Sequence, residues 1–205
     1  MSDKIYIFDT TLRDGAQTQG VDFSLDDKEK ISLALDNLGV DYIEGGWPGA
    51  NPTDTEFFNK KHSFHHSILT AFGMTKKSDH SAENDPMISS LINSKANSIC
   101  LFGKSWDFHV DVALGITKDQ NLKNISESAK HIINSGKEFM FDAEHFFDGY
   151  KSNKEYALSC IKSAYDQGAR WIVLCDTNGG TLPHEVSKIV ADVSKHIPGK
   201  NLGIH

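Results

Sequence analysis

The chain alternates between short apolar runs and longer stretches in which apolar residues recur every three or four positions. Short apolar runs without strict alternation are typical of parallel β-strands that are covered on both faces. They predict strands at Ile5–Leu12, Tyr42–Trp47, Ile68–Phe72, Ser98–Phe102, Phe139–His145, Trp171–Asp176 and Leu202–His205.

The stretches between these runs carry helix signals. Ser24 followed by Asp27 predicts a capped helix start, and Gly39 predicts its end. Helical spacing recurs in residues 122–133 and 157–164, each stretch being followed by a glycine, and Pro183 suits the first turn of a further helix. Residues 53–64 and 80–94 are weaker helix candidates.

Regular alternation of strands and helices predicts an α/β fold with parallel strands. Units of roughly 30 residues favour a (β/α)8 TIM barrel, which typically needs about 250 residues. We therefore expect residues 1–205 to form one partial barrel domain with about seven of the eight βα units. A doubly wound sheet is the alternative, although no Gly-x-Gly-x-x-Gly turn follows the first strand. Because the chain ends inside a strand pattern, we expect truncation.

Composition narrows the class of protein. Hydrophobic residues make up 39% and charged residues 24%, as in globular proteins, and no apolar run is long enough for a membrane span. A net charge of −7 disfavours nucleic-acid binding but does not exclude an anionic small-molecule substrate, because a metal or one arginine can supply local positive charge. The first residues show no secretory pattern, which predicts a cytoplasmic protein. Cys100, Cys160 and Cys175 lie in apolar patterns and are interpreted as core residues.

Polar residues gather where the predicted strands end. In a barrel these carboxyl ends surround the active site. A carboxylate with imidazole nitrogens can hold a divalent ion, which acts as a Lewis acid on a 2-oxo acid, while an arginine stabilises the enolate or alkoxide. The residues at these ends are Arg13, Asp14, Glu44, Asp142, Glu144, Asp176, Thr177 and His205.

Five of these residues also have a structural interpretation. Arg13 and Asp14 could be an ion pair at a strand end, and Glu44 could hydrogen-bond inside the barrel mouth. Asp142 and Glu144 could form an ionic layer in the barrel. Their shared position favours function. His109 could reach the pocket, whereas the remaining internal histidines are expected at the surface, namely His62, His65, His66, His80, His131, His184 and His196.

The segment DTTLRDGAQ (residues 9–17) resembles the signature of the 2-isopropylmalate, homocitrate and citramalate synthases. Hydroxymethylglutaryl-CoA lyase and the transferase domain of pyruvate carboxylase are more distant relatives. Four runs look like the citramalate synthase branch: EGGWPGANP (44–52), KSWDFH (104–109), FDAEHFFDGY (141–150) and LCDTNGGTLP (174–183). The likeness extends over residues 5–205.

The resemblance implies a TIM barrel that condenses acetyl-CoA with pyruvate to citramalate and CoA, an entry to isoleucine synthesis. It implies a divalent ion, Mg²⁺, Mn²⁺ or Zn²⁺, bound by Asp14 and His205. Arg13 would be catalytic and would bind substrate, and Glu144 would be a second catalytic residue. Thr177 and Gln17 would bind substrate. The full-length parent is expected to be a homodimer.

The family's second metal-binding histidine would lie two positions beyond His205, outside this sequence. We therefore expect the isolated chain to be inactive. Alternatives are a sister synthase for a longer 2-oxo acid, such as 2-isopropylmalate synthase, or a non-catalytic remnant that binds a ligand or partner. A lyase is disfavoured by the strand-2 and strand-5 runs.

Overall fold

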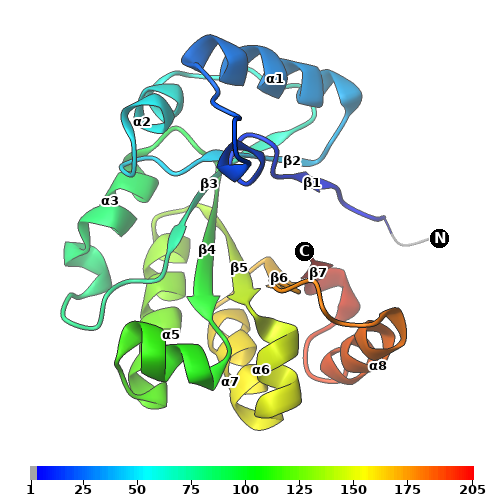
Figure 1. Cartoon of the computed structure of the whole chain (residues 1–205). Helices are drawn as coiled ribbons and strands as arrows, with labels where there is room; N and C mark the ends of the chain where they lie inside the picture. Colours follow the sequence, from blue (N-terminus) through cyan, green and yellow to red (C-terminus); the bar gives the residue numbers. More distant parts are fainter. Residues whose placement is uncertain (1–3) are drawn as a thin grey trace. The chain divides into compact units, whose positions relative to one another are not determined.

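The computed structural model describes residues 4–205 and contains a seven-stranded sheet (Figure 1). The strands are parallel and follow one another in chain order, which is the order of a (β/α)8 barrel. The incomplete α/β barrel expected from the sequence is confirmed, and the doubly wound alternative is not observed. The strands are β1 Phe8–Asp9, β2 Tyr42–Gly46, β3 Ile68–Met74, β4 Ser98–Lys104, β5 Glu138–Glu144, β6 Trp171–Leu174 and β7 Leu202–Ile204.

The first strand is shorter than expected. Strand β1 covers Phe8–Asp9 only, and Ile5 and Ile7 are exposed instead of buried. The carbonyl oxygen of Thr10 accepts the backbone N–H groups of the three residues from Arg13 to Gly15, so the chain turns directly after the strand. The predicted span Ile5–Leu12 is therefore too long at both ends. Its first residues are exposed, and the residues after Asp9 form the turn instead of continuing the strand.

The predicted helix boundaries are largely confirmed. Ser24 and Asp27 form a reciprocal capping box, and Gly39 ends the helix in the left-handed conformation with φ 87°. Pro183 occupies the first turn of its helix. The helices are α1 Leu25–Leu38, α2 Pro52–Asn59, α3 Pro86–Asn93, α4 Asp107–His109, α5 Lys118–Asn134, α6 Phe146–Ser152, α7 Lys154–Tyr165 and α8 Pro183–Val193. Helices α4 and α6 and a π-helical turn at Val110–Leu114 were not predicted.

The chain divides into two compact units, which are described separately. Unit 1 comprises the residues up to Gly73 together with Pro86–Cys100, and unit 2 comprises Met74–Asp85 and Leu101–His205. The core of unit 1 is apolar and fully buried, as expected for strands covered by helices. It includes Ile43, Phe57, Phe58, Leu69, Ile88 and Leu91.

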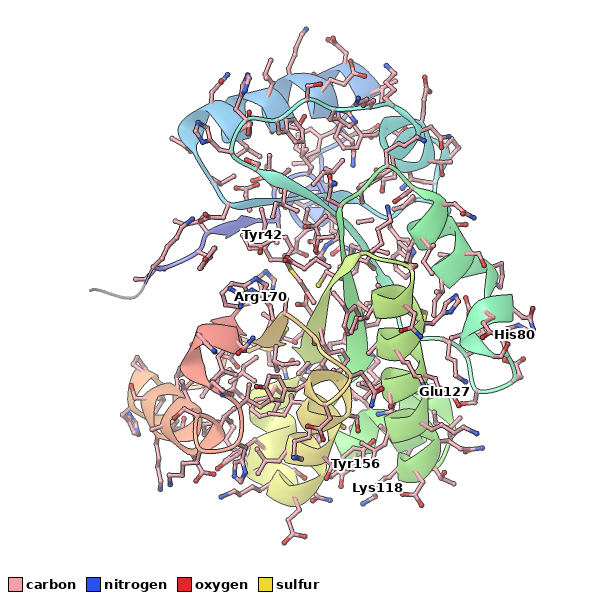
Figure 2. All side chains as sticks on the ribbon, turned by 180° about the vertical axis from the view of Figure 1, so that it is seen from behind. Tyr42, His80, Lys118, Glu127, Tyr156 and Arg170 are labelled. Atoms are coloured by element: carbon pink, nitrogen blue, oxygen red, sulfur yellow. The ribbon has the colours of Figure 1, made fainter. Side chains whose placement is uncertain are left out.

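Unit 2 is built on strands β5 and β6, which pair in register from Met140 with Trp171 onward. Helix α7 packs against both α5 and α6. Between α5 and α7, the buried Asn121 donates to the hydroxyl of Tyr156 at 2.8 Å and to the carbonyl of Lys104 at 2.8 Å. Figure 2 shows Tyr156 and Lys118 side by side at this junction, where the Lys118 ammonium lies 5.6 Å from the Tyr156 ring. The hydrogen bond from Asn121 to the carbonyl of Lys104 fixes the carboxyl end of β4.

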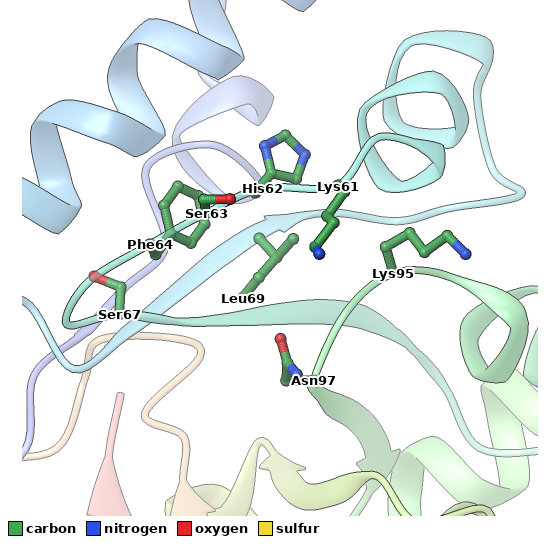
Figure 3. Close-up of a pocket in the computed structure, with 8 residues that line it drawn as sticks. All are labelled: Lys61, His62, Ser63, Phe64, Ser67, Leu69, Lys95 and Asn97. Carbon is green, nitrogen blue, oxygen red and sulfur yellow. The ribbon is translucent and has the colours of Figure 1, made fainter.

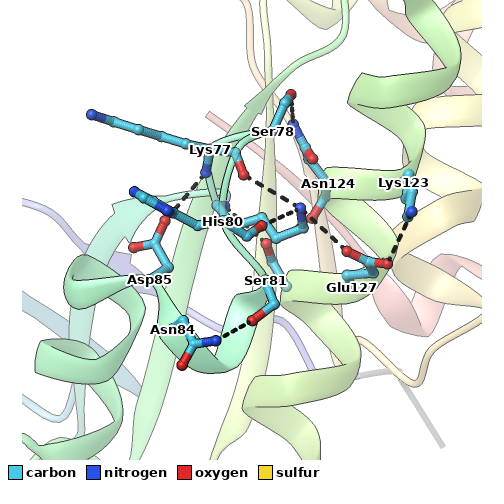
Figure 4. Close-up of polar contacts among 11 residues, drawn as sticks. Lys77, Ser78, His80, Ser81, Asn84, Asp85, Lys123, Asn124 and Glu127 are labelled. Atoms are coloured by element: carbon cyan, nitrogen blue, oxygen red, sulfur yellow. Dashed lines mark hydrogen bonds and ion pairs between the residues drawn. The ribbon is translucent and has the colours of Figure 1, made fainter.

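The loop after β3 is tied to α5 by hydrogen bonds (Figure 4). The buried Lys76 ammonium donates to the carbonyl of His80 at 2.9 Å and pairs with Glu127 at 3.2 Å. Asn124 donates to the hydroxyl of Ser78 at 2.8 Å. No helix within residues 4–205 is long and apolar enough to cross a membrane.

Candidate functional site

The turn after β1 places an arginine between two carboxylates in unit 1. The Nε of Arg13 donates to Glu44 Oε2 at 2.6 Å, and its Nη1 donates to Asp14 Oδ1 at 3.0 Å. Its guanidinium carbon lies 3.9 Å from the ring centre of Phe72 on β3. We call Arg13, Asp14 and Glu44 the arginine cluster. Charge-assisted bonds on two sides and a ring on a third orient this guanidinium.

The two carboxylates of the arginine cluster differ in exposure. Glu44 is completely buried, whereas the side chain of Asp14 is 43% exposed. Glu44 therefore serves as the buried counter-charge of Arg13, and Asp14 can be reached by a ligand. The ion pair and the hydrogen-bonded Glu44, which the sequence suggested as structural roles, are both present and belong to one assembly.

Two glycines let the chain pass close to α2 after Glu44. A Cβ at Gly45 would lie 2.7 Å from the Phe57 ring, and a Cβ at Gly46 would lie 2.5 Å from the carboxyl carbon of Asp54. Gly46 also has φ 140°, which side chains rarely adopt. The sequence EGG at the end of β2 is thus explained by close packing next to the arginine cluster.

Unit 2 carries a second group of polar residues at its strand ends, which we call the glutamate cluster: Lys104, Glu144, His145 and Thr177. Lys104, the last residue of β4, pairs with Glu144 Oε2 at 2.5 Å. The backbone N–H of His145 donates to Thr177 Oγ1 at 2.9 Å. The ends of β4 and β5 and the loop after β6 are thereby joined.

His145 has an unusual backbone. It is the one non-glycine residue with positive φ among residues 4–205, at φ 54°. Such a conformation costs about 1–3 kcal/mol and persists where the surroundings fix it. Its ring packs edge-on against His109 at 4.4 Å and lies 5.9 Å from Trp106. This histidine therefore has both its backbone and its ring held at the site.

His109 lies beside the glutamate cluster, as the sequence suggested it could. Burial lowers the pKa of its imidazole, and the neighbouring His145 and Lys104 lower that pKa further. The ring is therefore kept neutral at neutral pH, where it can accept a proton or a hydrogen bond.

The remaining predicted site residues are less closely connected. Gln17 is exposed in the turn Gly15–Gln17 of unit 1. His205 is exposed in unit 2, and its backbone pairs with Leu174 at 3.1 Å and with Asp176 at 2.9 Å. Asp14 and His205 belong to different units, so a metal site shared by them stays a prediction.

Some predictions from the sequence need correction, and others hold. The three cysteines are buried, as predicted. His62 was expected at the surface but is half-buried, with its ring 4.3 Å from that of Phe57. Its Nε2 lies 2.8 Å from the carbonyl oxygen of Phe57, and these two contacts explain the burial.

Lys104 and His145 were not singled out from the sequence. His145 ends the fifth apolar run, so the rule that selected Glu44 and Glu144 applies to it as well. Lys104 lies two residues beyond the fourth run, after Gly103, so that rule does not select it. The left-handed backbone of His145 had no signal, because histidine adopts it rarely.

A cavity of about 480 Å³ lies elsewhere in unit 1 (Figure 3). It is lined by residues 61–64, Ser67, Leu69, Lys95 and Asn97, which lie before or at the start of β3 and before β4. These are the amino ends of the strands, whereas barrel enzymes carry out their chemistry at the carboxyl ends. We therefore treat each of the two clusters, and not this cavity, as a candidate site within its own unit.

Comparison with solved structures supports the fold. Hydroxymethylglutaryl-CoA (HMG-CoA) lyase from Pseudomonas aeruginosa is 16% identical with a TM-score of 0.80, and covers 98% of this chain and 67% of its own. The HMG-CoA lyase from Brucella melitensis is 17% identical with a TM-score of 0.78, and the match covers 100% of this chain and 72% of the other. At this identity the likeness concerns the fold alone.

Curated sequences are more similar. The (R)-citramalate synthase of Aquifex aeolicus is 51% identical over all of this chain, and that of Sulfolobus acidocaldarius is 49% identical over 98% of it. The 2-isopropylmalate synthase of Sulfolobus acidocaldarius is 31% identical over all of this chain. The chain spans 39% of the length of both citramalate synthases and 50% of the isopropylmalate synthase.

The HMGL-like family model matches residues 4–205, which is nearly the whole chain. The match includes β1 with the turn that carries Arg13 and Asp14, and it extends through β7. On this evidence the chain belongs to the HMGL-like family.

Proposed function

We propose that this chain is the barrel part of a citramalate synthase, which condenses acetyl-CoA with pyruvate. The observation that carries the proposal is the oriented guanidinium of Arg13 beside the accessible carboxylate of Asp14. The similarity to citramalate synthases, 42% to 51% over nearly all of the chain, supports pyruvate as the 2-oxo acid. The relatives that act as isopropylmalate synthases are about 31% identical.

The proposed reaction forms one carbon–carbon bond. A base removes a proton from the methyl group of acetyl-CoA, and the resulting enolate carbon attacks the keto carbon of pyruvate. The keto oxygen takes up a proton and becomes the tertiary hydroxyl. Water then cleaves the thioester, which releases CoA and citramalate. Citramalate would feed isoleucine synthesis in the cytoplasm.

Asp14 and His205 are residue types that bind divalent ions. Asp14 offers a reachable carboxylate and His205 an exposed imidazole, a donor set that accepts Mg²⁺, Mn²⁺ or Zn²⁺. When bound, the ion would act as a Lewis acid toward the 2-oxo acid. In this proposal Asp14 and His205 hold the ion, and a homodimer of the whole protein is the expected assembly.

Arg13 and Glu144 take the catalytic roles in this proposal. Arg13 stabilises negative charge on the keto oxygen, because its guanidinium is already oriented by Glu44 and Phe72. Glu144 is our candidate base for the methyl proton, and Lys104 fixes the position of its carboxylate. Gln17, in the exposed turn after Arg13, contributes to substrate binding.

Thr177 is suited to bind the carboxylate of pyruvate. A hydroxyl has one proton to donate and two lone pairs that accept. One lone pair of Thr177 Oγ1 accepts the N–H of His145, which leaves the proton for an anionic oxygen of the substrate. The backbone of His145 thereby orients the hydroxyl of Thr177.

The experiment is a CoA-release assay on the product of the native gene that contains residues 1–205. Acetyl-CoA is supplied with pyruvate or with 2-oxoisovalerate, in the presence of Mg²⁺ or Mn²⁺. We expect pyruvate to give the larger kcat/KM. A preference for 2-oxoisovalerate would instead make the protein an isopropylmalate synthase, and the absence of turnover with any 2-oxo acid would contradict both.

A further inference from the structure

Lys28 is a charged residue with no place in the proposed chemistry, yet it is almost completely buried. It lies in the first turns of α1 and is 3% exposed. Lysine is almost never buried without a partner, because removing an ammonium from water costs several kcal/mol. Its contacts therefore need an explanation.

The ammonium of Lys28 makes three polar contacts, all within unit 1. It donates to the carbonyl of Leu12 at 2.9 Å and to that of Gly45 at 2.8 Å, and it pairs with Asp54 Oδ1 at 2.5 Å. An ammonium has three N–H donors, so these contacts use all of them.

The two carbonyls belong to the segments that carry the arginine cluster. Leu12 directly precedes Arg13, and Gly45 directly follows Glu44. One buried ammonium therefore joins the turn after β1 to the end of β2, next to the Arg13–Glu44 bond of 2.6 Å. We propose that Lys28 is a positioning residue, whose bonds to both backbone segments hold the guanidinium of Arg13 against Glu44.

Asp54 is the ion-pair partner of the ammonium. Its Oδ2 accepts the backbone N–H of Trp47 at 2.8 Å and the side-chain amide of Asn51 at 2.9 Å. Its carboxylate is therefore fixed by α2 and the loop before it, and Gly46 leaves the space it occupies. Asp54 compensates the charge of Lys28, while the two carbonyl bonds do the positioning.

Stability alone does not explain this arrangement. Replacing a buried ion pair with apolar residues of similar size is often neutral or stabilising. A methionine at position 28 would fill the same space without donating to either carbonyl. The charged pair thus provides directional bonds between two active-site segments, which an apolar pair cannot provide. The inference rests on the proposed function because Arg13 is its catalytic arginine. The position of Arg13 can nevertheless be measured without an activity assay.

Arg13 and Arg170 are the two arginines of the chain, which makes a direct test simple. In the ¹⁵N NMR spectrum of the native gene product, the Nε–H signals of these two residues are identified by their loss in Arg13→Lys and in Arg170→Lys. The Nε–H of Arg13 is bound to a buried carboxylate, so its exchange with water should be slow. Arg170, whose Nη1 donates to the carbonyl of Lys200, is the internal reference.

The test variant is Lys28→Met combined with Asp54→Asn, which removes the donors without leaving a buried charge. We expect Arg13 Nε–H exchange to become at least about tenfold faster, while circular dichroism shows a folded chain. Lys30→Met is the matched control, since Lys30 lies on the same helix and its partner Asp26 is exposed. Asp54→Asn alone keeps the carbonyl bonds and should leave the Arg13 signal protected.

Unchanged Arg13 protection in the folded double variant would overturn the inference. Loss of protection in Asp54→Asn alone would also overturn it, since the ion pair and not the carbonyl bonds would then position Arg13. If the double variant does not fold, the charge was required for stability and the positioning role is rejected. Failure of the CoA-release assay with the unmodified protein would reject the proposed function and leave this test valid.

Discussion

The two polar clusters are held in place by different kinds of interaction. In unit 1 the arginine cluster rests on charge: Arg13 is bound to the buried Glu44, and Lys28 bonds the neighbouring backbone. In unit 2 the glutamate cluster contains the Lys104–Glu144 ion pair and the hydrogen bond from His145 to Thr177, and the left-handed His145 is held by ring packing. The first cluster depends on directional charged bonds, and the second depends on close packing.

This difference predicts how each cluster fails. Substitution in the arginine cluster should abolish chemistry while the fold survives, because oriented charge is lost without a cavity. Substitution in the packing around the glutamate cluster should lower stability first. The predictions below run from the largest expected effect to the smallest.

Arg13→Lys should lower kcat for citramalate formation by about 100- to 1,000-fold in the CoA-release assay. A lysine keeps the charge but cannot reproduce the guanidinium geometry between Glu44 and Asp14. Arg170→Lys is the control and should remain active. Retention of parental kcat in Arg13→Lys would remove Arg13 from catalysis.

Gly149→Ala should destabilise the protein by about 1–3 kcal/mol through overpacking. A Cβ at Gly149, on α6, would overlap the carbonyl oxygen of Ser105, which directly follows Lys104. Urea denaturation followed by circular dichroism measures the loss. Gly199→Ala is the control, since nothing lies within 4 Å of the Cβ there. Equal stability of the two variants would show that a methyl group fits between Gly149 and the carbonyl of Ser105.

Thr177→Val should raise the KM for pyruvate about tenfold, the equivalent of one lost hydrogen bond of about 1.4 kcal/mol. It also leaves the N–H of His145 without the hydroxyl that accepts it. Thr177→Ser keeps the hydroxyl and should restore most of the affinity. A KM in Thr177→Val equal to that of the parent would show that the hydroxyl does not contact substrate.

The smallest effect concerns pH and His109. Its pKa lies below the ordinary value near 6.5 because burial disfavours the charged ring. The unfolded chain therefore binds the proton first, and stability falls as the pH drops below about 6.5. Thermal melts from pH 8 to pH 5 should show a smaller loss for His109→Phe than for the parent. An identical pH dependence would mean that His109 does not titrate in this range.

Much of the fold was predictable because it depends on local signals. The Ser24–Asp27 capping box and the left-handed Gly39 lie where the sequence predicted them. Strand β1 was predicted too long, since a turn centred on the carbonyl of Thr10 ends it early. Helix α6 was missed because it begins directly after β5.

The candidate site was predictable by position but not by partner. Strand ends identified Arg13 and Glu44, yet nothing in the sequence indicated that they bind each other, because their 31-residue separation is bridged only in the fold. Lys28 was not singled out from the sequence, because its role depends on two distant carbonyls. Contacts of this kind are set by tertiary packing, which local patterns do not encode.

The most direct measurement uses acetyl-CoA that carries ¹³C in its methyl group and locates this label in the product. The native gene product containing residues 1–205 is incubated with this substrate, pyruvate and Mn²⁺, and the products are analysed by ¹³C NMR. We expect the label in the methylene carbon of citramalate, because the methyl carbon forms the new bond. Label recovered only in free acetate would show thioester hydrolysis without condensation and would contradict the proposed function.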